Sequence, residues 1–168
     1  LQMYVANGTD AQRFYLIETP ADAHTFDGTY TILSSKNQSF AIDVSGASSA
    51  SRSNIQLWQS NGTGAQKFRF LYSGGGYYRI LNVNSGCAVD VCGGNPANWV
   101  NIWQYAYNGS DAQLWAVKDN GDGTVTFLNK KGKALDLAGA NTDNGTNIET
   151  YTENGTPDQK WILRSKTR

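Results

Sequence analysis

One set of three residue types recurs along the chain at a fixed spacing. In each copy an aspartate is followed 15 residues later by an aromatic residue and 23 residues later by a glutamine. The sets are Asp43, Trp58 and Gln66; Asp90, Tyr105 and Gln113; and Asp136, Tyr151 and Gln159. A carboxylate accepts charge-assisted hydrogen bonds from adjacent hydroxyl groups, and an aromatic ring offers an apolar platform. The spacing therefore predicts a ligand-binding site that is repeated with the chain.

These residues must be positioned by an equally repetitive set of elements. The aspartates lie 47 and 46 residues apart, so a unit of about 46 residues occurs three times. Each unit contains four short runs typical of β-strands, separated by turn residues. The twelve predicted strands are residues 29–33, 40–44, 54–58, 66–71, 77–81, 87–91, 101–105, 113–117, 124–128, 134–137, 147–151 and 159–163. No helix-period stretch of useful length interrupts them, so the sequence predicts an all-β protein.

Apolar residues flank each aspartate and identify part of the core. Because side chains alternate along a strand, the apolar pair should point inward and the aspartate outward. The flanking pairs are Ile42 and Val44, Val89 and Val91, and Leu135 and Leu137. Phe68, Trp115 and Trp161, each two residues after a repeat glutamine, should form a buried aromatic layer. One unit cannot bury its apolar face alone, whereas three units around a pseudo-threefold axis can, and a propeller would normally need four or more.

Turn residues agree with this division into strands. The pairs Asn61-Gly62, Asn108-Gly109 and Asn154-Gly155 occupy one position of the unit and favour tight turns with positive φ. Their recurrence favours a structural role over the glycosylation sequon that they also form. Residues 119–123 are typical of a hairpin tip, because the downstream glutamate of a calcium loop is missing. We therefore predict no metal site.

Composition excludes several classes of partner. The chain has 14 basic and 14 acidic residues, which is unsuited to nucleic acid or to anionic membranes. No apolar run approaches the length that spans a bilayer, so we expect no membrane insertion. A polar, weakly charged surface is common in proteins that meet neutral ligands outside the cell. Cys87 and Cys92 are expected to be free thiols if they lie in an extended strand, although a turn between them could allow a bond.

Short motifs at these positions resemble those of a known family. Gln66-Lys67-Phe68, Gln113-Leu114-Trp115 and Gln159-Lys160-Trp161 are similar to the Q-x-W motif of ricin-B-like β-trefoil lectins. The turns that begin at Asp43, Asp90 and Asp136 resemble the sugar-binding aspartate turn of that family. The resemblance spans residues 28–163, and three motifs in phase are far more specific than one. It implies a β-trefoil of twelve strands with up to three sugar pockets and no cofactor.

The resemblance also implies which residues would contact a sugar. An aromatic ring can stack on the apolar C–H face of a pyranose while the aspartate holds two hydroxyl groups. The implied sites are Asp43, Gln56, Trp58 and Asn61; Asp90, Trp103, Tyr105 and Asn108; and Asp136, Glu149, Tyr151 and Asn154. Each aspartate could instead bond backbone N–H groups of its own turn. Trp58 could likewise pack beside the barrel mouth.

The sequence departs from the family pattern in two respects. Many members have asparagine just before the motif glutamine, but Ala65, Ala112 and Asp158 stand there. The disulfide within each repeat is also missing, since Tyr107 stands where the partner of Cys87 would be. These differences put a galactose-type pattern in doubt and leave the sugar open among galactosides, xylan-type chains and other glycans. Trp99 has no counterpart in the other repeats and could be a contact surface or a loop anchor.

The chain divides into unequal parts. Residues 1–17 match the second half of a unit, with Tyr4 at the aromatic position and Gln12 at the glutamine. We therefore expect at least one more trefoil upstream in a parent protein, although these strands could instead pair with a neighbouring molecule. Residues 18–27 are predicted to be a linker. The trefoil should cover residues 28–163, with repeats at 28–74, 75–121 and 122–163, followed by a tail at 164–168.

Three classes of function fit these observations unequally. A non-catalytic carbohydrate-binding module, secreted or at the cell surface and joined to other domains of the same parent chain, accounts for the repeated acid and aromatic residue. A protein-binding trefoil, inhibitor or cytokine-like, would need one specialised loop and no such recurrence. A glycosidase needs two carboxylates across one cleft, and only the third repeat adds a nearby acid, Glu149. His24 is the single histidine and lies in the linker, so no nucleophile–histidine pair is expected.

Overall fold

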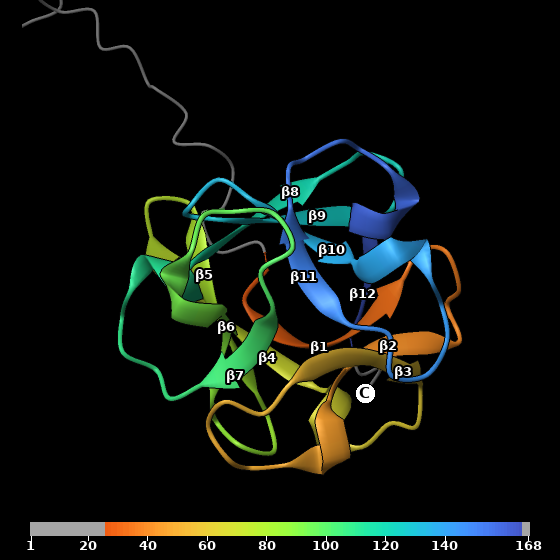
Figure 1. The fold of residues 1–168 in the computed structure, drawn as a ribbon, viewed down its shortest axis with the longest axis horizontal. Helices are drawn as coiled ribbons and strands as arrows, with labels where there is room; N and C mark the ends of the chain where they lie inside the picture. The colour runs from red at the N-terminus through yellow and green to blue at the C-terminus, as the bar shows by residue number, and fades with distance from the viewer. Residues whose placement is uncertain (1–25, 166–168) are drawn as a thin grey trace, which may run out of the picture.

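The computed structural model describes residues 26–165, which form twelve β-strands and short 3-10 turns (Figure 1). The strands are β1 (Gly28–Ser34), β2 (Phe40–Val44), β3 (Ile55–Gln59), β4 (Phe68–Gly74), β5 (Tyr77–Asn82), β6 (Ala88–Val91), β7 (Ile102–Tyr105), β8 (Trp115–Asp119), β9 (Val125–Asn129), β10 (Ala134–Leu137), β11 (Ile148–Tyr151) and β12 (Trp161–Ser165). The predicted all-β architecture of twelve strands in three repeats is confirmed.

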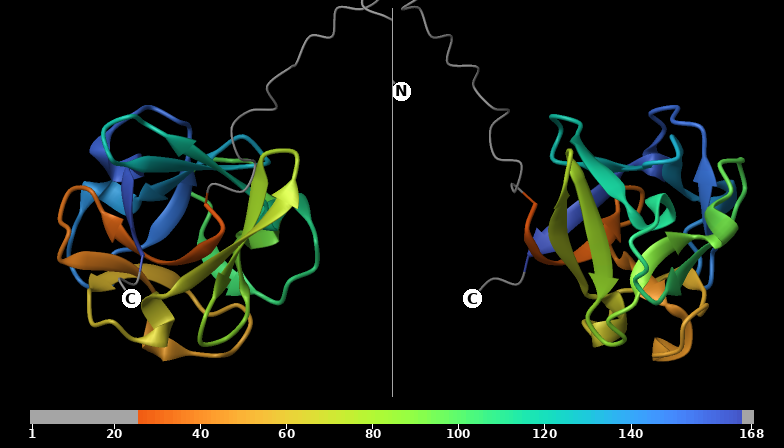
Figure 2. Two further views of the ribbon diagram at one scale, coloured as in Figure 1. Left: turned by 180° about the vertical axis from the view of Figure 1, so that it is seen from behind. Right: turned by 90° about the vertical axis from the view of Figure 1, so that its left-hand side faces the viewer.

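Six of the strands close into a barrel. Antiparallel pairing runs from β1 to β4, β5, β8, β9 and β12, and β12 pairs with β1 again. The other six strands form three hairpins, β2–β3, β6–β7 and β10–β11, one from each repeat. The hairpins surround a central axis in Figure 1, and Figure 2 shows the same arrangement from behind and from the side. This is the β-trefoil that the family resemblance implies, and it presents each hairpin in an equivalent environment.

The core lies inside the barrel and under the hairpins. Phe68, Trp115 and Trp161 are buried, as the repeat position predicts. The indole N–H of Trp115 donates to the carbonyl oxygen of Val89 at 3.0 Å, and that of Trp161 donates to Leu135 at 3.2 Å. The apolar pairs beside the three aspartates are buried in the same cluster. Each hairpin is therefore fixed to the barrel by the residues that flank its aspartate.

Three strands begin later than the sequence predicts. β4, β8 and β12 start two residues after Gln66, Gln113 and Gln159 and not at these glutamines. The glutamines instead end the 3-10 turns η3 (Gly64–Gln66), η5 (Asp111–Gln113) and η7 (Pro157–Gln159). The reason is that each glutamine side chain binds the backbone of the loop before it, which bends the chain into a turn. The other predicted bounds differ from the structure by no more than two residues, except that β4 ends at Gly74, three residues later than predicted.

Several smaller predictions have clear outcomes. Cys87 and Cys92 are both free thiols, as predicted. Residues 119–123 form the tip of the β8–β9 hairpin, where Asn120 N–H donates to the carbonyl oxygen of Thr124 at 3.0 Å. The half-repeat at 1–17, most of the linker and the last residues of the tail lie outside the described residues. Within residues 26–165 no helix could cross a bilayer and no group of three or more acidic, histidine or cysteine side chains could hold a metal ion.

Candidate functional site

Each repeat aspartate lies one residue before the end of a hairpin strand, followed by a sharp turn. The turns η2 (Ser45–Ala47), η4 (Cys92–Gly94) and η6 (Ala138–Ala140) are three residues long. Their middle residues Gly46, Gly93 and Gly139 have φ of 63°, 63° and 59°. This left-handed conformation costs roughly 1–2 kcal/mol in most other residues but is accessible to glycine. The glycine therefore lets the chain fold back beside the aspartate and border a pocket.

The hairpin register brings the remaining side chains to the same face. Asp43 is paired with Gln56, Asp90 with Trp103, and Asp136 with Glu149. Residues directly opposite each other in an antiparallel pair share one face, and so does the residue two positions further along the strand. That further residue is the aromatic one of the repeated set. The 15-residue spacing thus places the acid and the aromatic ring on one face of one hairpin.

The first pocket is a cavity of about 320 Å³. It is lined by Asp43, Gln56, Trp58 and Asn61 together with the turn around Gly46. The amide of Gln56 donates to Asp43 Oδ1 at 3.2 Å, which leaves acceptor capacity on the carboxylate. Trp58 is 39 % exposed, so part of its ring is accessible to a ligand.

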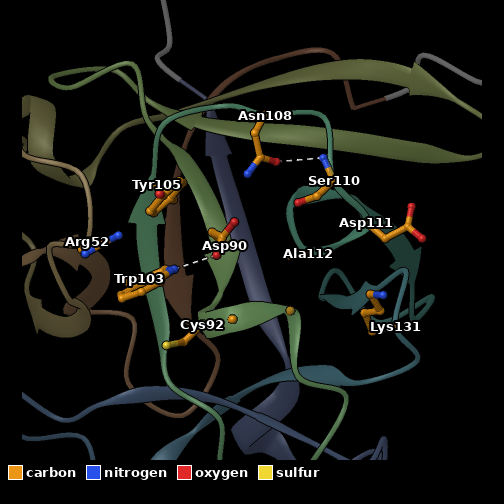
Figure 3. Close-up of a pocket in the computed structure, with 12 residues that line it drawn as sticks. Arg52, Asp90, Cys92, Trp103, Tyr105, Asn108, Ser110, Asp111, Ala112 and Lys131 are labelled. Carbon is orange, nitrogen blue, oxygen red and sulfur yellow. Dashed lines mark hydrogen bonds between the residues drawn. The ribbon is translucent and has the colours of Figure 1, made fainter.

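The second pocket is larger, at about 580 Å³, and is shown in Figure 3. The indole N–H of Trp103 donates to Asp90 Oδ1 at 2.6 Å. The rings of Trp103 and Tyr105 are 5.8 Å apart and inclined by 27°, so they form two adjacent platforms. Arg52, which belongs to the preceding repeat, has its guanidinium carbon 5.8 Å from the Tyr105 ring. This pocket therefore combines two rings with two acids, Asp90 and Asp111, and two cations, Arg52 and Lys131.

The third pocket, about 250 Å³, is the most acidic. It includes Asp136, Glu149 and Asp158, and Asp158 is paired with Lys36 at 2.7 Å. Gln159 donates to Asp136 Oδ2 at 2.8 Å, and an ionised Glu149 has no proton to donate across the hairpin. Tyr151 lies here beside Trp99 of the preceding repeat.

The three asparagines next to the pockets are held in one orientation. Asn61 Oδ1 accepts the backbone N–H of Thr63 at 3.0 Å, Asn108 Oδ1 that of Ser110 at 2.9 Å, and Asn154 Oδ1 that of Thr156 at 3.0 Å. These are Asx turns, in which the side-chain oxygen binds the backbone two residues on. The side-chain NH₂ groups make no hydrogen bond to another described residue. Each asparagine can therefore offer its pocket a side-chain donor.

The repeat glutamines hold the loops that carry these asparagines. The side-chain oxygen of each glutamine accepts a backbone N–H at 2.8–2.9 Å, from Asn61, Asn108 and Asn154. The side-chain nitrogen of each donates to a backbone carbonyl at 2.9–3.1 Å, those of Gln59, Ala106 and Thr152. All three glutamines are fully buried. The three glutamines are therefore structural hydrogen-bonding residues.

The expectation that the aspartates point outward is only partly correct. They lie on the opposite face from the apolar pairs, but Asp43, Asp90 and Asp136 are only 6 %, 5 % and 8 % exposed. The side chain across the hairpin and the glycine turn cover most of each carboxylate, and strand alternation alone does not predict that cover. Each carboxylate therefore meets solvent only through its pocket.

Burial changes the acidity of these groups. It raises the pKa of Asp43, and hydrogen bonds from Gln56 and Gln66 oppose this shift. Burial likewise raises the pKa of Asp90 and of Asp136 above the ordinary aspartate value. The pKa of Glu149 is also raised, first by burial and then by the charge of Asp136. A ligand hydroxyl that donates to these carboxylates would restore part of the solvation that burial removes.

The structure places all twelve predicted site residues around three cavities, four to each. Their role in ligand binding stays a prediction. The sequence analysis missed Arg52 and did not assign Trp99 to any site. The reason is that each residue belongs to one repeat and lines the pocket of the next. The prediction that Trp99 has no counterpart is wrong in position, because Arg52 occupies the same place in the unit 47 residues earlier and differs only in side chain. That shared position is the signal that could have found both residues.

Residues 64–151 match the family described as ricin-type beta-trefoil lectin domain-like. A designed threefold-symmetric protein, ThreeFoil, is 34 % identical, with a TM-score of 0.79 over 82 % of this chain and 98 % of its own. No curated protein sequence matches the chain.

Two natural proteins of solved structure are also similar. An exo-β-1,3-galactanase from Clostridium thermocellum, 1,3Gal43A, is 30 % identical with a TM-score of 0.78. The match covers 81 % of this chain and 30 % of the galactanase chain. The agglutinin of Rhizoctonia solani is 26 % identical with a TM-score of 0.75, over 83 % of this chain and 96 % of the agglutinin.

Proposed function

Because the chain belongs to the ricin-type β-trefoil lectin domain-like family, we propose that it binds carbohydrate without catalysis through its three hairpin pockets. One observation carries the proposal. Each hairpin holds a carboxylate with free acceptor capacity, an aromatic ring and an asparagine NH₂ group around one cavity. This combination fits a pyranose, which has hydroxyl groups at its edge and C–H groups on its faces.

The proposed ligand is a neutral glycan, with galactose-containing chains as the first candidates. The part of the galactanase that matches this chain supports this choice, because it is 30 % identical in sequence. We do not infer that this chain cleaves galactan. Ala65 and Ala112 border the first two pockets and provide no side-chain hydrogen bond there. We therefore expect each pocket to bind a single sugar weakly, with a Kd in roughly the millimolar to micromolar range.

Tethering is the role that weak, repeated pockets can perform. Three pockets on one rigid barrel can engage one polymeric glycan together, so that the second contact becomes intramolecular. The chain spans only 30 % of the galactanase that it resembles. We propose a secreted or surface module that holds other domains of its parent protein on a glycan.

The test is binding of the purified chain to a broad glycan array and to soluble β-1,3-galactan. For the first pocket, the double variant Asp43→Ala with Trp58→Ala should reduce calorimetric stoichiometry by one site while the Tm stays close to that of the unmodified chain. The matched control is Asp119→Ala with Tyr107→Ala, an acid and an exposed ring outside the pockets. Unchanged glycan binding in the first double variant would reject the first-pocket assignment. A blank array would reject carbohydrate binding and favour a protein partner.

A further inference from the structure

One loop position of each repeat contacts the next repeat in the same way. Arg52, Trp99 and Gly145 occupy it, between the two strands of each hairpin, and all have positive φ, at 72°, 60° and 86°. Each donates its backbone N–H to a carbonyl of the third strand of the following repeat. The bonds are Arg52 to Gln104 at 2.7 Å, Trp99 to Thr150 at 2.7 Å and Gly145 to Leu57 at 2.9 Å. The three loops thus dock cyclically around the threefold axis.

A second contact fixes each loop. The residue before this position bonds the following repeat through its side-chain oxygen. The bonds are Ser51 with Ala106 N–H at 3.1 Å, Asn98 with Thr152 Oγ1 at 3.0 Å and Asn144 with Gln59 N–H at 2.7 Å. The connection between β6 and β7 consequently runs beside β11 (Figure 1). The residue at position 99 is held next to the third pocket.

The side chain at this position differs in the three repeats. Trp99 brings its ring to 5.6 Å from the ring of Tyr151, with an angle of 61° between the planes. Gly145 leaves the corresponding place in the first pocket empty. The three pockets therefore have hairpin halves of the same layout, and they also differ in what the preceding repeat supplies.

A purely structural role does not account for the Trp99 side chain. The anchoring contact is made by its backbone N–H, and Arg52 and Gly145 make the same contact with other side chains. The side chain is 70 % exposed, so little apolar area is gained by packing it against Tyr151. Its φ of 60° is also unusual for a bulky residue. An exposed ring beside a second ring at the rim of a pocket suits a ligand contact.

We propose that Trp99 is a second stacking platform of the third pocket, which is therefore built from two repeats and binds two consecutive neutral sugars. This inference rests on the proposed carbohydrate binding. Two inclined rings form a corner, so one pyranose can stack on Tyr151 while its chain neighbour stacks on Trp99. The carboxylates of Asp136 and Glu149 disfavour an acidic sugar at this place.

The experiment compares disaccharides with monosaccharides at the third pocket alone. Asp43→Ala and Asp90→Ala disable the other two pockets in the full chain, and Trp99→Gly is added to this background. The probes are β-1,3-galactobiose and xylobiose, each measured against its methyl monosaccharide by calorimetry. Loss of one stacking contact should lower the affinity for the bound disaccharide by about 10-fold and leave the monosaccharide nearly unchanged.

Folding is controlled in the same experiment. Glycine adopts positive φ readily, so Trp99→Gly should keep or raise the Tm. The matched control Tyr107→Gly removes an exposed ring outside the pocket and should not change the disaccharide preference. As a gain of function, Gly145→Trp in the chain with Asp90→Ala and Asp136→Ala should create such a preference in the first pocket. The new Cβ would meet no atom within 4 Å, but the φ of 86° strains any side chain, so the Tm of this variant should fall and its folding is checked by the same thermal scan.

Each outcome decides between the two proposals. An unchanged disaccharide preference in Trp99→Gly overturns the inference and leaves carbohydrate binding intact. No sugar binding in the Asp43→Ala, Asp90→Ala background overturns the inference as well, while binding by the unmodified chain still supports the proposed function. A shift of the Trp99 indole N–H resonance in the NMR spectrum on addition of disaccharide, but not of monosaccharide, supports the inference directly. No binding by the unmodified chain overturns both.

Discussion

At the scale of single residues, the three pockets are distinguished by what lies opposite the aspartate. Gln56 and Trp103 each donate a hydrogen bond to the carboxylate, at 3.2 Å and 2.6 Å. Glu149 places a second acid there. In the first pocket the donor leaves Asp43 as the single charged acceptor for a ligand, whereas in the third pocket Glu149 adds an acceptor, and its pKa is raised by burial and then by the charge of Asp136. The first and third pockets should therefore rank sugar epimers differently.

The pH dependence of binding follows from the raised aspartate pKa values. A ligand hydroxyl donates best to the ionised carboxylate, and burial moves ionisation of Asp43, Asp90 and Asp136 to higher pH. Glycan affinity should therefore fall as the pH drops towards the ordinary aspartate pKa of about 3.9, and it should start to fall above that value. Calorimetric titrations between neutral and acidic pH will check this. An affinity that is constant down to the ordinary pKa would contradict a carboxylate contact.

The same pKa shifts affect stability in the opposite direction. A carboxyl whose pKa is higher in the folded state binds its proton more tightly there, so its contribution to stability grows as pH falls through its folded-state pKa towards its unfolded-state pKa. At neutral pH the buried charge of Asp136 lowers the stability of the fold. Asp136→Asn should raise the Tm at pH 7, flatten its pH dependence and abolish binding at the third pocket. Thermal scans at several pH values measure the first two effects. A lower Tm at pH 7 would contradict this, because it would show that the hydrogen bond from Gln159 to the ionised carboxylate stabilises the fold by more than burial of the charge destabilises it.

At the scale of elements, the loop that carries each pocket asparagine depends on one buried glutamine. Gln113 joins the N–H of Asn108 at 2.8 Å to the carbonyl of Ala106 at 3.1 Å. Gln113→Ala should lower the free energy of unfolding by about 2–4 kcal/mol, because two backbone groups lose their partner and a cavity remains. Denaturant titration measures this value. Gln59→Ala is the control, since the side chain of Gln59 is exposed and should change stability by less than about 0.5 kcal/mol.

At the scale of the whole molecule, the threefold arrangement makes binding multivalent. The three hairpins surround one axis on a closed barrel, so the pockets keep fixed mutual positions. On an immobilised polymeric glycan the chain should bind more tightly than on a single sugar unit, by roughly 10²-fold or more. Disabling one pocket at a time, with Asp43→Ala, Asp90→Ala or Asp136→Ala, should weaken polymer binding far more than monomer binding. Biosensor measurements on both surfaces test this, and equal losses on the two would exclude multivalent tethering.

The repeat spacing by itself determined much of the fold. Constant distances between Asp43, Trp58 and Gln66 and their counterparts require one supersecondary unit used three times, and the apolar pairs beside the aspartates fix which face is buried. Contacts inside a hairpin are local in sequence, so the spacing alone is enough to bring residues such as Asp43 and Gln56 together. The four predicted residues of each pocket therefore surround one cavity.

Only the tertiary structure decided what crosses from one repeat to the next. Arg52 and Trp99 reach the second and third pockets because the loop between hairpin strands docks on the following repeat through long-range backbone hydrogen bonds. The burial of Asp43, Asp90 and Asp136, and with it their raised pKa, also depends on neighbours that strand alternation does not specify. A repeated sequence encodes the half of each pocket that lies on its own hairpin, whereas closure of the barrel adds the residue that the preceding repeat supplies.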